Sequence, residues 1–193
     1  WTPNFVTEGD SYSGSFGNSG WGDAVVIIPW TMYTTYGDAR YITDNYAAMK
    51  KWVARYEKLS GPGRILDSSN YGDWLSVDAD TPKDLVSTGY FAYCADLLSR
   101  MAAAVGEGED AAYYRQVFEQ VRDAFCKSFV SADGRVKGET QTGYLLALKF
   151  DLLPMPRLRE RAAALLVENI EAKAWHLSTG FLGVAYLLPV LTE

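Results

Sequence analysis

Two kinds of predicted helix alternate along the chain. One kind is apolar on nearly all sides, as in the run from Ala24 to Trp30 and in the last segment, 180–191. The other kind repeats apolar residues at steps of three and four and carries charges between them, which is typical of a helix with one buried face. A helix that is apolar all round has to be covered all round. The first kind is therefore predicted to be inner and the second outer.

The pattern predicts helices in the order inner, outer, inner, outer, inner, outer, inner, separated by glycine, proline and Asp-Gly breaks. Thr81 is expected to cap the helix that begins at Pro82. Residues 64–81 are expected to form a long loop. The predicted inner helices are 22–36, 82–105, 140–150 and 180–191, and the outer ones are 39–59, 109–130 and 156–172.

This order gives three and a half αα-hairpins of unequal length, unlike the fixed period of a repeat array. The fold class is therefore predicted to be all-α, an α-hairpin toroid of which the chain forms about half. Residues 1–193 are interpreted as one partial domain, with the Gly/Ser/Asn-rich residues 1–20 as an irregular lead-in loop. Half a toroid leaves an apolar seam along 24–36 and 180–191, which the remainder of the barrel is expected to cover.

Composition narrows the class of protein. The net charge of −6 without a basic cluster argues against nucleic acid or an anionic membrane as a partner. Six Trp and thirteen Tyr are many for a helical protein; their faces fill cores and also stack on sugar rings, and core packing is the commoner use. No membrane span is predicted. Cys94 and Cys126 are expected to be buried free thiols.

Polar and aromatic residues occur where the inner helices are predicted to begin. If these helices run parallel, their N-terminal ends meet at one mouth of the toroid, the usual place for a ligand. The residues expected there are Trp21, Asp23, Asp73, Trp74, Gln141, Thr142, His176, Ser178 and Thr179.

Glycoside hydrolysis needs two carboxyl groups that flank the scissile bond. From spacing alone, Asp23, Asp73 and Glu139 are candidates, although a helix cap or a loop hydrogen bond is the commoner role for each. His176 is the only histidine, and a lone histidine is more often structural than functional. No phosphate-binding loop, dinucleotide fingerprint or metal-ligand spacing occurs, so neither a cofactor nor a metal is expected.

Four motifs follow one another in a specific order. They are Gly-Trp-Gly-Asp-Ala at 20–24, Tyr-Gly-Asp-Trp-Leu at 71–75, Thr-Gln-Thr-Gly-Tyr at 140–144 and His-Leu-Ser-Thr-Gly-Phe-Leu-Gly at 176–183. Together they resemble the catalytic domain of bacterial α-L-rhamnosidases, glycoside hydrolase family 78, and the resemblance covers the chain after about residue 20. It implies a six-hairpin (α/α)6 barrel, of which this chain is the middle portion.

The resemblance also implies a glycosidase that removes terminal α-L-rhamnose with inversion. The family's Trp residues in Gly-Trp-Gly-Asp and Gly-Asp-Trp line the rhamnose pocket, which carries over to Trp21 and Trp74. With Asp23, Asp73 and His176 they form the predicted substrate-binding set. The family's general acid and general base belong to Cys-Pro-x-Arg-x-Glu-Arg and Trp-Glu-x-Trp segments that this chain lacks. No catalytic residue is therefore expected here, and the isolated chain is expected to be inactive.

Two other interpretations remain open. The chain could be a non-catalytic helical module that binds a glycan or a protein, or part of another six-hairpin glycosidase, such as one acting on unsaturated uronides. The expected partners are a rhamnose-containing carbohydrate and the remainder of the barrel. The sequence contains no signal that assigns a compartment.

Overall fold

The computed structural model describes residues 18–67 and 71–192, and these residues are predominantly helical. No strand occurs in the described ranges, where a single isolated bridge pairs Val130 with Val136. The predicted all-α class is confirmed. Most of the lead-in loop predicted for 1–20 lies outside the described residues. The helices are α1 (Ala24–Tyr36), α2 (Arg40–Thr43), α3 (Tyr46–Ser60), the 3-10 turn η1 (Gly61–Gly63), α4 (Lys83–Ala104), α5 (Gly108–Phe129), α6 (Gln141–Lys149), α7 (Pro156–Ala172) and α8 (Phe181–Thr192).

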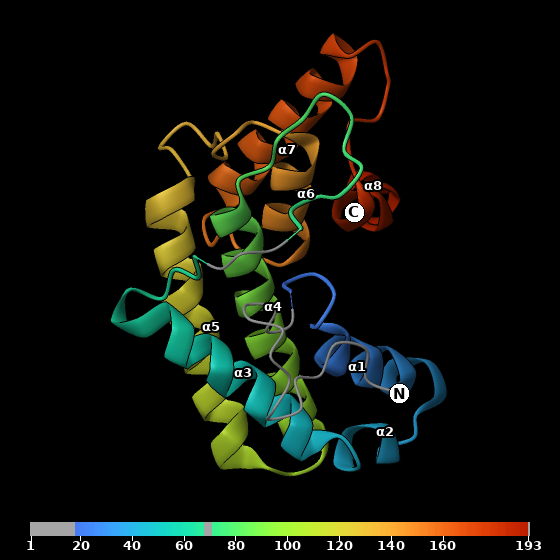
Figure 1. The fold of residues 1–193 in the computed structure, drawn as a ribbon, viewed down its shortest axis with the longest axis vertical. Coiled ribbons are helices and arrows are strands. Elements are labelled where there is room, and N and C mark those ends of the chain that lie inside the picture. Colours follow the sequence, from blue (N-terminus) through green and yellow to red (C-terminus); the bar gives the residue numbers. More distant parts are fainter. Residues whose placement is uncertain (1–17, 68–70, 193) are drawn as a thin grey trace, which may run out of the picture.

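The apolar helices follow one another through the molecule. α1 packs against α4, α4 against α6, and α6 against α8 (Figure 1). The amphipathic helices lie beside them, because α3 and α5 pack on α4 and α7 packs on α6. The predicted alternation of inner and outer helices is confirmed.

The two central inner helices, α4 and α6, are covered on all sides. Almost every side chain of α4 between Leu85 and Met101 is buried, and α6 is buried from Gln141 to Leu148. Aromatic rings fill the space between elements: Tyr93 stacks on Phe150 with ring centroids 4.1 Å apart. The apolar pattern of these two helices therefore has the burial that it predicts.

The two flanking inner helices, α1 and α8, are more apolar than α4 but keep an open face. Only Val26 and Pro29 are buried in α1. In α8, Leu182, Gly183 and Leu187 are buried, whereas Leu188 is 72% exposed. The apolar seam that the sequence predicts along 24–36 and 180–191 is present in the described chain.

One predicted helix is broken. The outer helix expected over 39–59 is divided into α2 and α3, with Asp44 and Asn45 between them. The side chain of Asn45 donates a hydrogen bond to the carbonyl oxygen of Tyr41 (2.9 Å). Short polar side chains compete in this way with the helical hydrogen bonds of the main chain, which a pattern of apolar positions does not report.

The start of α4 also differs from the prediction. Thr81 does not cap the helix, since its hydroxyl lies 2.8 Å from the hydroxyl of Thr140, and the N-cap is Pro82. The Thr81 hydroxyl therefore links the segments before α4 and α6 and does not cap α4.

Candidate functional site

The starts of α6 and α8 meet at the side chain of Asp73. One carboxylate oxygen of Asp73 accepts hydrogen bonds from the N–H of Gly180 (2.6 Å) and from the hydroxyl of Thr142 (2.5 Å). The other accepts from the N–H groups of Leu182 (2.8 Å) and Gly183 (3.2 Å). The first N–H groups of a helix have no partner within it, and the helix dipole favours a negative charge there. Asp73 thereby fastens the start of α8 to the loop before α4 and to α6.

Close packing explains two glycines of the last motif. A Cβ atom at Gly180 would collide with main-chain atoms of Asp73, Trp74 and Ser76, and one at Gly183 would collide with the hydroxyl of Thr142. In Figure 1 the green loop that leads into α4 passes beside the red α8. The two glycines let the backbones approach closely enough for Asp73 to reach the helix start.

The first residues of α6 hold two further segments. The buried side-chain amide of Gln141 donates from Nε2 to the carbonyl oxygen of His176 (3.2 Å) and accepts at Oε1 from the N–H of Ser178 (2.9 Å). Thr140 caps α6 by accepting from the N–H of Gly143 (3.1 Å). Residues 140–142 therefore fix the segment before α8, the loop before α4 and their own helix.

Asp23 performs a similar task for α1. It is 0% exposed, and Oδ1 accepts from Trp52 Nε1 (2.7 Å), Tyr56 OH (2.9 Å) and Cys94 Sγ (3.1 Å). Oδ2 accepts from the N–H of Gly20 (2.6 Å). Burial raises the pKa of Asp23 above its ordinary value of 3.8, and the hydrogen bonds oppose this shift in part. Asp23 thus joins the start of α1 to α3 and α4.

The carboxylates of Asp23 and Asp73, which are both predicted to bind substrate, are enclosed by their hydrogen-bond donors. Asp23 is inaccessible to solvent and Asp73 is 6% exposed, and every carboxylate oxygen of both already accepts at least one hydrogen bond. Glu139 is exposed and forms an ion pair with Arg135. The two aspartates organise the site from beneath and present no free oxygen to a ligand.

Aromatic rings form the outer surface of the same region. Trp74 is 55% exposed, and its indole stacks on the ring of Phe181 at 5.7 Å with an interplanar angle of 24°. Trp21 is half-buried and meets the ring of Tyr71 edge-on at 5.2 Å. We call the surface formed by these four residues the mouth. Sequence reasoning identified the two tryptophans but missed Tyr71 and Phe181, whose neighbours are set only by the fold.

The segment before α8 borders the mouth. His176 is exposed, and its Nδ1 lies 3.0 Å from the carbonyl oxygen of Lys173. The buried hydroxyl oxygens of Ser178 and Thr179 have no hydrogen-bond partner among the described residues. Unpaired buried hydroxyls are uncommon, so this segment is a place where an additional polar group is expected.

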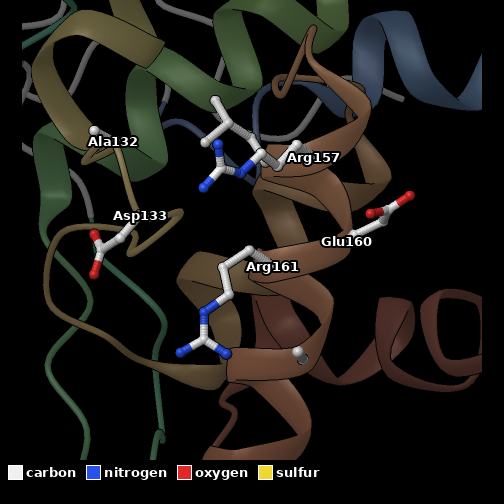
Figure 2. A pocket seen from close by; sticks show the side chains of 7 residues that line it. Ala132, Asp133, Arg157, Glu160 and Arg161 are labelled. Carbon is white, nitrogen blue, oxygen red and sulfur yellow. The ribbon is translucent and has the colours of Figure 1, made fainter.

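The depressions found elsewhere on the described surface have different chemistry. The one in Figure 2, of about 380 Å³, lies between the N-terminal half of α7 and the turn at Ala132 and Asp133. Arg157 and Arg161 project from α7 towards this turn, and Glu160 projects away from it. No aromatic side chain lines this depression, so it lacks the exposed ring faces of the mouth.

Within residues 18–67 and 71–192, no group of three or more His, Cys, Asp or Glu side chains is arranged to hold a metal ion. None of the helices described there is long and apolar enough to span a bilayer. Cys94 and Cys126 are both free, and Cys94 is buried as predicted, whereas Cys126 is only half-buried.

Comparison with known proteins identifies relatives of the whole chain. The model of the bacterial α-L-rhamnosidase six-hairpin glycosidase domain matches residues 1–193. An α-L-rhamnosidase of Streptomyces avermitilis is 48% identical over 182 residues, which are 93% of this chain and 17% of that protein. An α-L-rhamnosidase of Formosa agariphila is 40% identical over 185 residues, 91% of this chain and 20% of that protein. The chain thus spans about a fifth of the length of these relatives.

Solved structures show the same arrangement of helices. The crystal structure of the Streptomyces avermitilis α-L-rhamnosidase complexed with L-rhamnose superposes with a TM-score of 0.87 at 47% identity, covering 93% of this chain and 17% of that one. The native α-L-rhamnosidase from Aspergillus terreus superposes with a TM-score of 0.84 at 31% identity, covering 91% of this chain and 21% of that one.

Proposed function

The chain belongs to the family of bacterial α-L-rhamnosidase six-hairpin glycosidase domains, and on that premise we propose that it supplies a sugar-binding surface to an enzyme that hydrolyses terminal α-L-rhamnose from glycosides. The observation that supports this most strongly is the exposed Trp74 ring, which is stacked on Phe181 and anchored through Asp73. Rhamnose presents a methyl group and C–H faces that pack on an indole.

The catalytic carboxyl groups of this enzyme are proposed to come from outside the described chain. Asp23 and Asp73 are buried acceptors, so neither can protonate a leaving group or activate a water molecule. Trp21 and Trp74 are proposed to contact the sugar, and His176 to lie at the edge of the site. The reaction is proposed to proceed with inversion, as the resemblance to glycoside hydrolase family 78 implies.

The exposed faces of α1 and α8 are proposed to pack against the remaining hairpins of the domain. Leu188 and Ile28 are exposed although both belong to helices that are apolar all round. This chain spans about a fifth of the length of its relatives, which contain ample further sequence to cover such faces. The rest of the barrel is therefore its proposed partner.

The proposed activity can be tested with aryl glycosides. The full-length protein is expected to hydrolyse 4-nitrophenyl α-L-rhamnoside, and proton NMR is expected to show β-L-rhamnose as the first product, because inversion changes the anomeric configuration. The isolated 193-residue chain is expected to give no turnover. Release of the α anomer would exclude inversion, and hydrolysis of an unsaturated uronide in preference to the rhamnoside would contradict the assigned substrate.

A non-catalytic binding module is the second candidate, because the two motif aspartates are consumed by structural hydrogen bonds. The same assay separates the two functions. Binding of L-rhamnose by a full-length protein that shows no turnover of any aryl glycoside would favour the binding module.

A further inference from the structure

An exposed tryptophan lies in an unfavourable backbone conformation in the segment between α7 and α8. Ala174 and Trp175 have φ angles of 51° and 64°, in the left-handed region that L residues other than glycine, asparagine and aspartate rarely adopt. The indole of Trp175 is 71% exposed. Neither the backbone nor the burial of the side chain explains a tryptophan at this position. Such residues occur preferentially where they serve a function.

The segment has the hydrogen bonds of a Schellman motif at the end of α7. The N–H of Ala174 donates to the carbonyl oxygen of Glu171, and the N–H of Trp175 donates to that of Ile170, each at 2.9 Å. In this motif the residue at the position of Ala174 is usually glycine, and an apolar residue at the position of Trp175 usually packs back on the helix at Ile170. The exposure of Trp175 shows that its indole largely lacks that contact.

The backbone that follows Trp175 is held in place from the buried side. Gln141 bonds the carbonyl oxygen of His176 and the N–H of Ser178 through its amide. Because this clamp lies on the buried face of the segment, the exposed indole projects from a backbone that is fixed on both sides of it. A rigid aromatic ring on a fixed backbone suits ring stacking.

The same segment runs along the loop that carries Trp74. The N–H of Val77 donates to the carbonyl oxygen of Ser178 (3.3 Å), and Lys173 Nζ lies 3.5 Å from the carbonyl oxygen of Asp78. Trp175 lies between Lys173 and Ser178. These two residues contact Asp78 and Val77, which follow Trp74 by four and three residues. Trp175 is therefore displaced along these two segments from the stacked rings of Trp74 and Phe181.

We propose that Trp175 is a second ring-stacking residue, which binds the group attached to the terminal rhamnose. Its ligand is a ring with an apolar face, supplied either by a second sugar or by an aryl aglycone. This inference rests on the proposed function, because it takes the sugar at Trp74 to be rhamnose. The mouth would then bind the terminal rhamnose, and Trp175 would bind the group that hydrolysis releases from it.

The test uses the full-length protein and a variant that preserves the backbone. Asn tolerates a positive φ, so Trp175→Asn removes the indole without forcing the segment into a new conformation. Ala174→Gly is the matched control, because it relieves the same backbone strain and leaves the indole in place. Trp175→Tyr restores an aromatic face. Three ligands are titrated by calorimetry: L-rhamnose, an aryl 1-thio-α-L-rhamnoside and an S-linked rhamnosyl-glucose disaccharide, because the oxygen-linked forms would be hydrolysed during the titration.

Trp175→Asn is expected to leave the Kd of L-rhamnose within twofold of wild type and to weaken at least one larger ligand about tenfold. Loss confined to the aryl rhamnoside identifies an aryl group as the ligand of Trp175, loss confined to the disaccharide identifies a sugar, and loss of both shows that any apolar ring face is accepted. Ala174→Gly is expected to bind all three ligands as wild type does, and Trp175→Tyr to recover most of the lost affinity.

Thermal unfolding separates a binding role from a packing role. Trp175→Asn and Ala174→Gly are expected to keep or raise Tm, since both relieve an unfavourable φ. A clear fall in Tm for Trp175→Asn alone would show that the indole packs against another part of the protein and would overturn the proposal, as would unchanged affinity for both larger ligands. A wild-type protein that does not bind L-rhamnose would instead refute the proposed function itself.

Discussion

The surroundings of Asp23 and of Asp73 differ in the donors that each carboxylate receives. Asp23 accepts mainly from side chains, those of Trp52, Tyr56 and Cys94, deep between α1, α3 and α4. Asp73 accepts mainly from main-chain N–H groups in the first turn of α8. Both follow a glycine in a short motif that also contains a tryptophan. A similar Gly-Asp motif therefore has two structural roles. At Asp23 the carboxylate binds buried side chains in the core, and at Asp73 it binds the free N–H groups at the start of a helix.

This difference predicts how much stability each region loses when its aspartate is substituted. The N–H groups that donate to Asp73 have no other acceptor among the described residues, because the first N–H groups of a helix lack a partner within the helix. The side-chain donors around Asp23 have more freedom, since Tyr56 OH also lies 3.1 Å from the Ser19 hydroxyl. Substitution of Asp73 should therefore reduce the stability of the fold more than substitution of Asp23. The loss of stability on replacing Asp23 by a residue that does not titrate should depend on pH.

The largest effect is expected for Asp73→Ala. The substitution removes the acceptor of the N–H groups of Gly180, Leu182 and Gly183 at the start of α8 and of the Thr142 hydroxyl, so the predicted loss of stability is on the order of 3–5 kcal/mol. Calorimetric unfolding of the full-length protein measures it, and hydrogen exchange should show that α8 opens first. Exchange that rises equally in α1 and in α8 would mean that Asp73 does not act locally on the helix start.

Asp23→Asn is expected to cost less, roughly 1–3 kcal/mol, and the cost should vary with pH. Burial raises the folded-state pKa of Asp23 above 3.8, so the folded protein holds this proton more tightly than the unfolded one. The contribution of Asp23 to stability is therefore fully present below pH 3.8 and is lost as the pH rises through the folded-state pKa.

Since Asn does not titrate, the stability difference between wild type and Asp23→Asn should be largest near pH 4 and shrink towards pH 7. Unfolding measured at several pH values on both proteins gives this difference directly. A difference that grows with pH would show that the four donors stabilise the ionised carboxylate more than burial destabilises it.

Gln141 and His176 extend the comparison to the segment before α8. Gln141→Leu leaves the buried N–H of Ser178 without its acceptor, with an expected cost of about 1–2 kcal/mol. His176→Ala removes an exposed ring and its contact with the carbonyl oxygen of Lys173, while the segment stays held through the carbonyl oxygen of His176. Its effect on stability should therefore stay within about 0.5 kcal/mol. A Tm for His176→Ala as low as that for Gln141→Leu would show that the imidazole, and not the main chain, supports the segment.

The sequence predicts the helices better than it predicts the roles of the residues between them. Helix order and type follow from apolar periodicity, which depends only on which faces are buried, so α4, α5, α6 and α7 begin and end within two residues of their predicted bounds. The break at Asn45 escaped prediction because it depends on one side-chain hydrogen bond. The sequence predicts that the motif aspartates lie near helix starts, but whether a carboxylate points outwards or inwards depends on contacts with residues far along the chain.

Trp175 is a residue that the sequence does not single out. A tryptophan after the end of an amphipathic helix carries no pattern that separates it from core packing, and its positive φ is a property of the folded segment. Trp74 could be singled out because its neighbours in the sequence are polar and glycine-rich. The partner ring of Phe181 could not, because it approaches Trp74 only when Asp73 draws α8 to the loop.

The buried aspartates support the mouth, and the aromatic rings are proposed to bind the sugar. The most direct test of this proposal is a calorimetric titration of L-rhamnose into the full-length Trp74→Ala variant, with Tm measured on the same sample. Affinity should weaken by about 1–3 kcal/mol, the order expected for loss of a large apolar contact, while Tm stays close to that of wild type because Trp74 is 55% exposed. Unchanged affinity, or a variant that unfolds, would show instead that Trp74 packs the fold and does not bind the sugar.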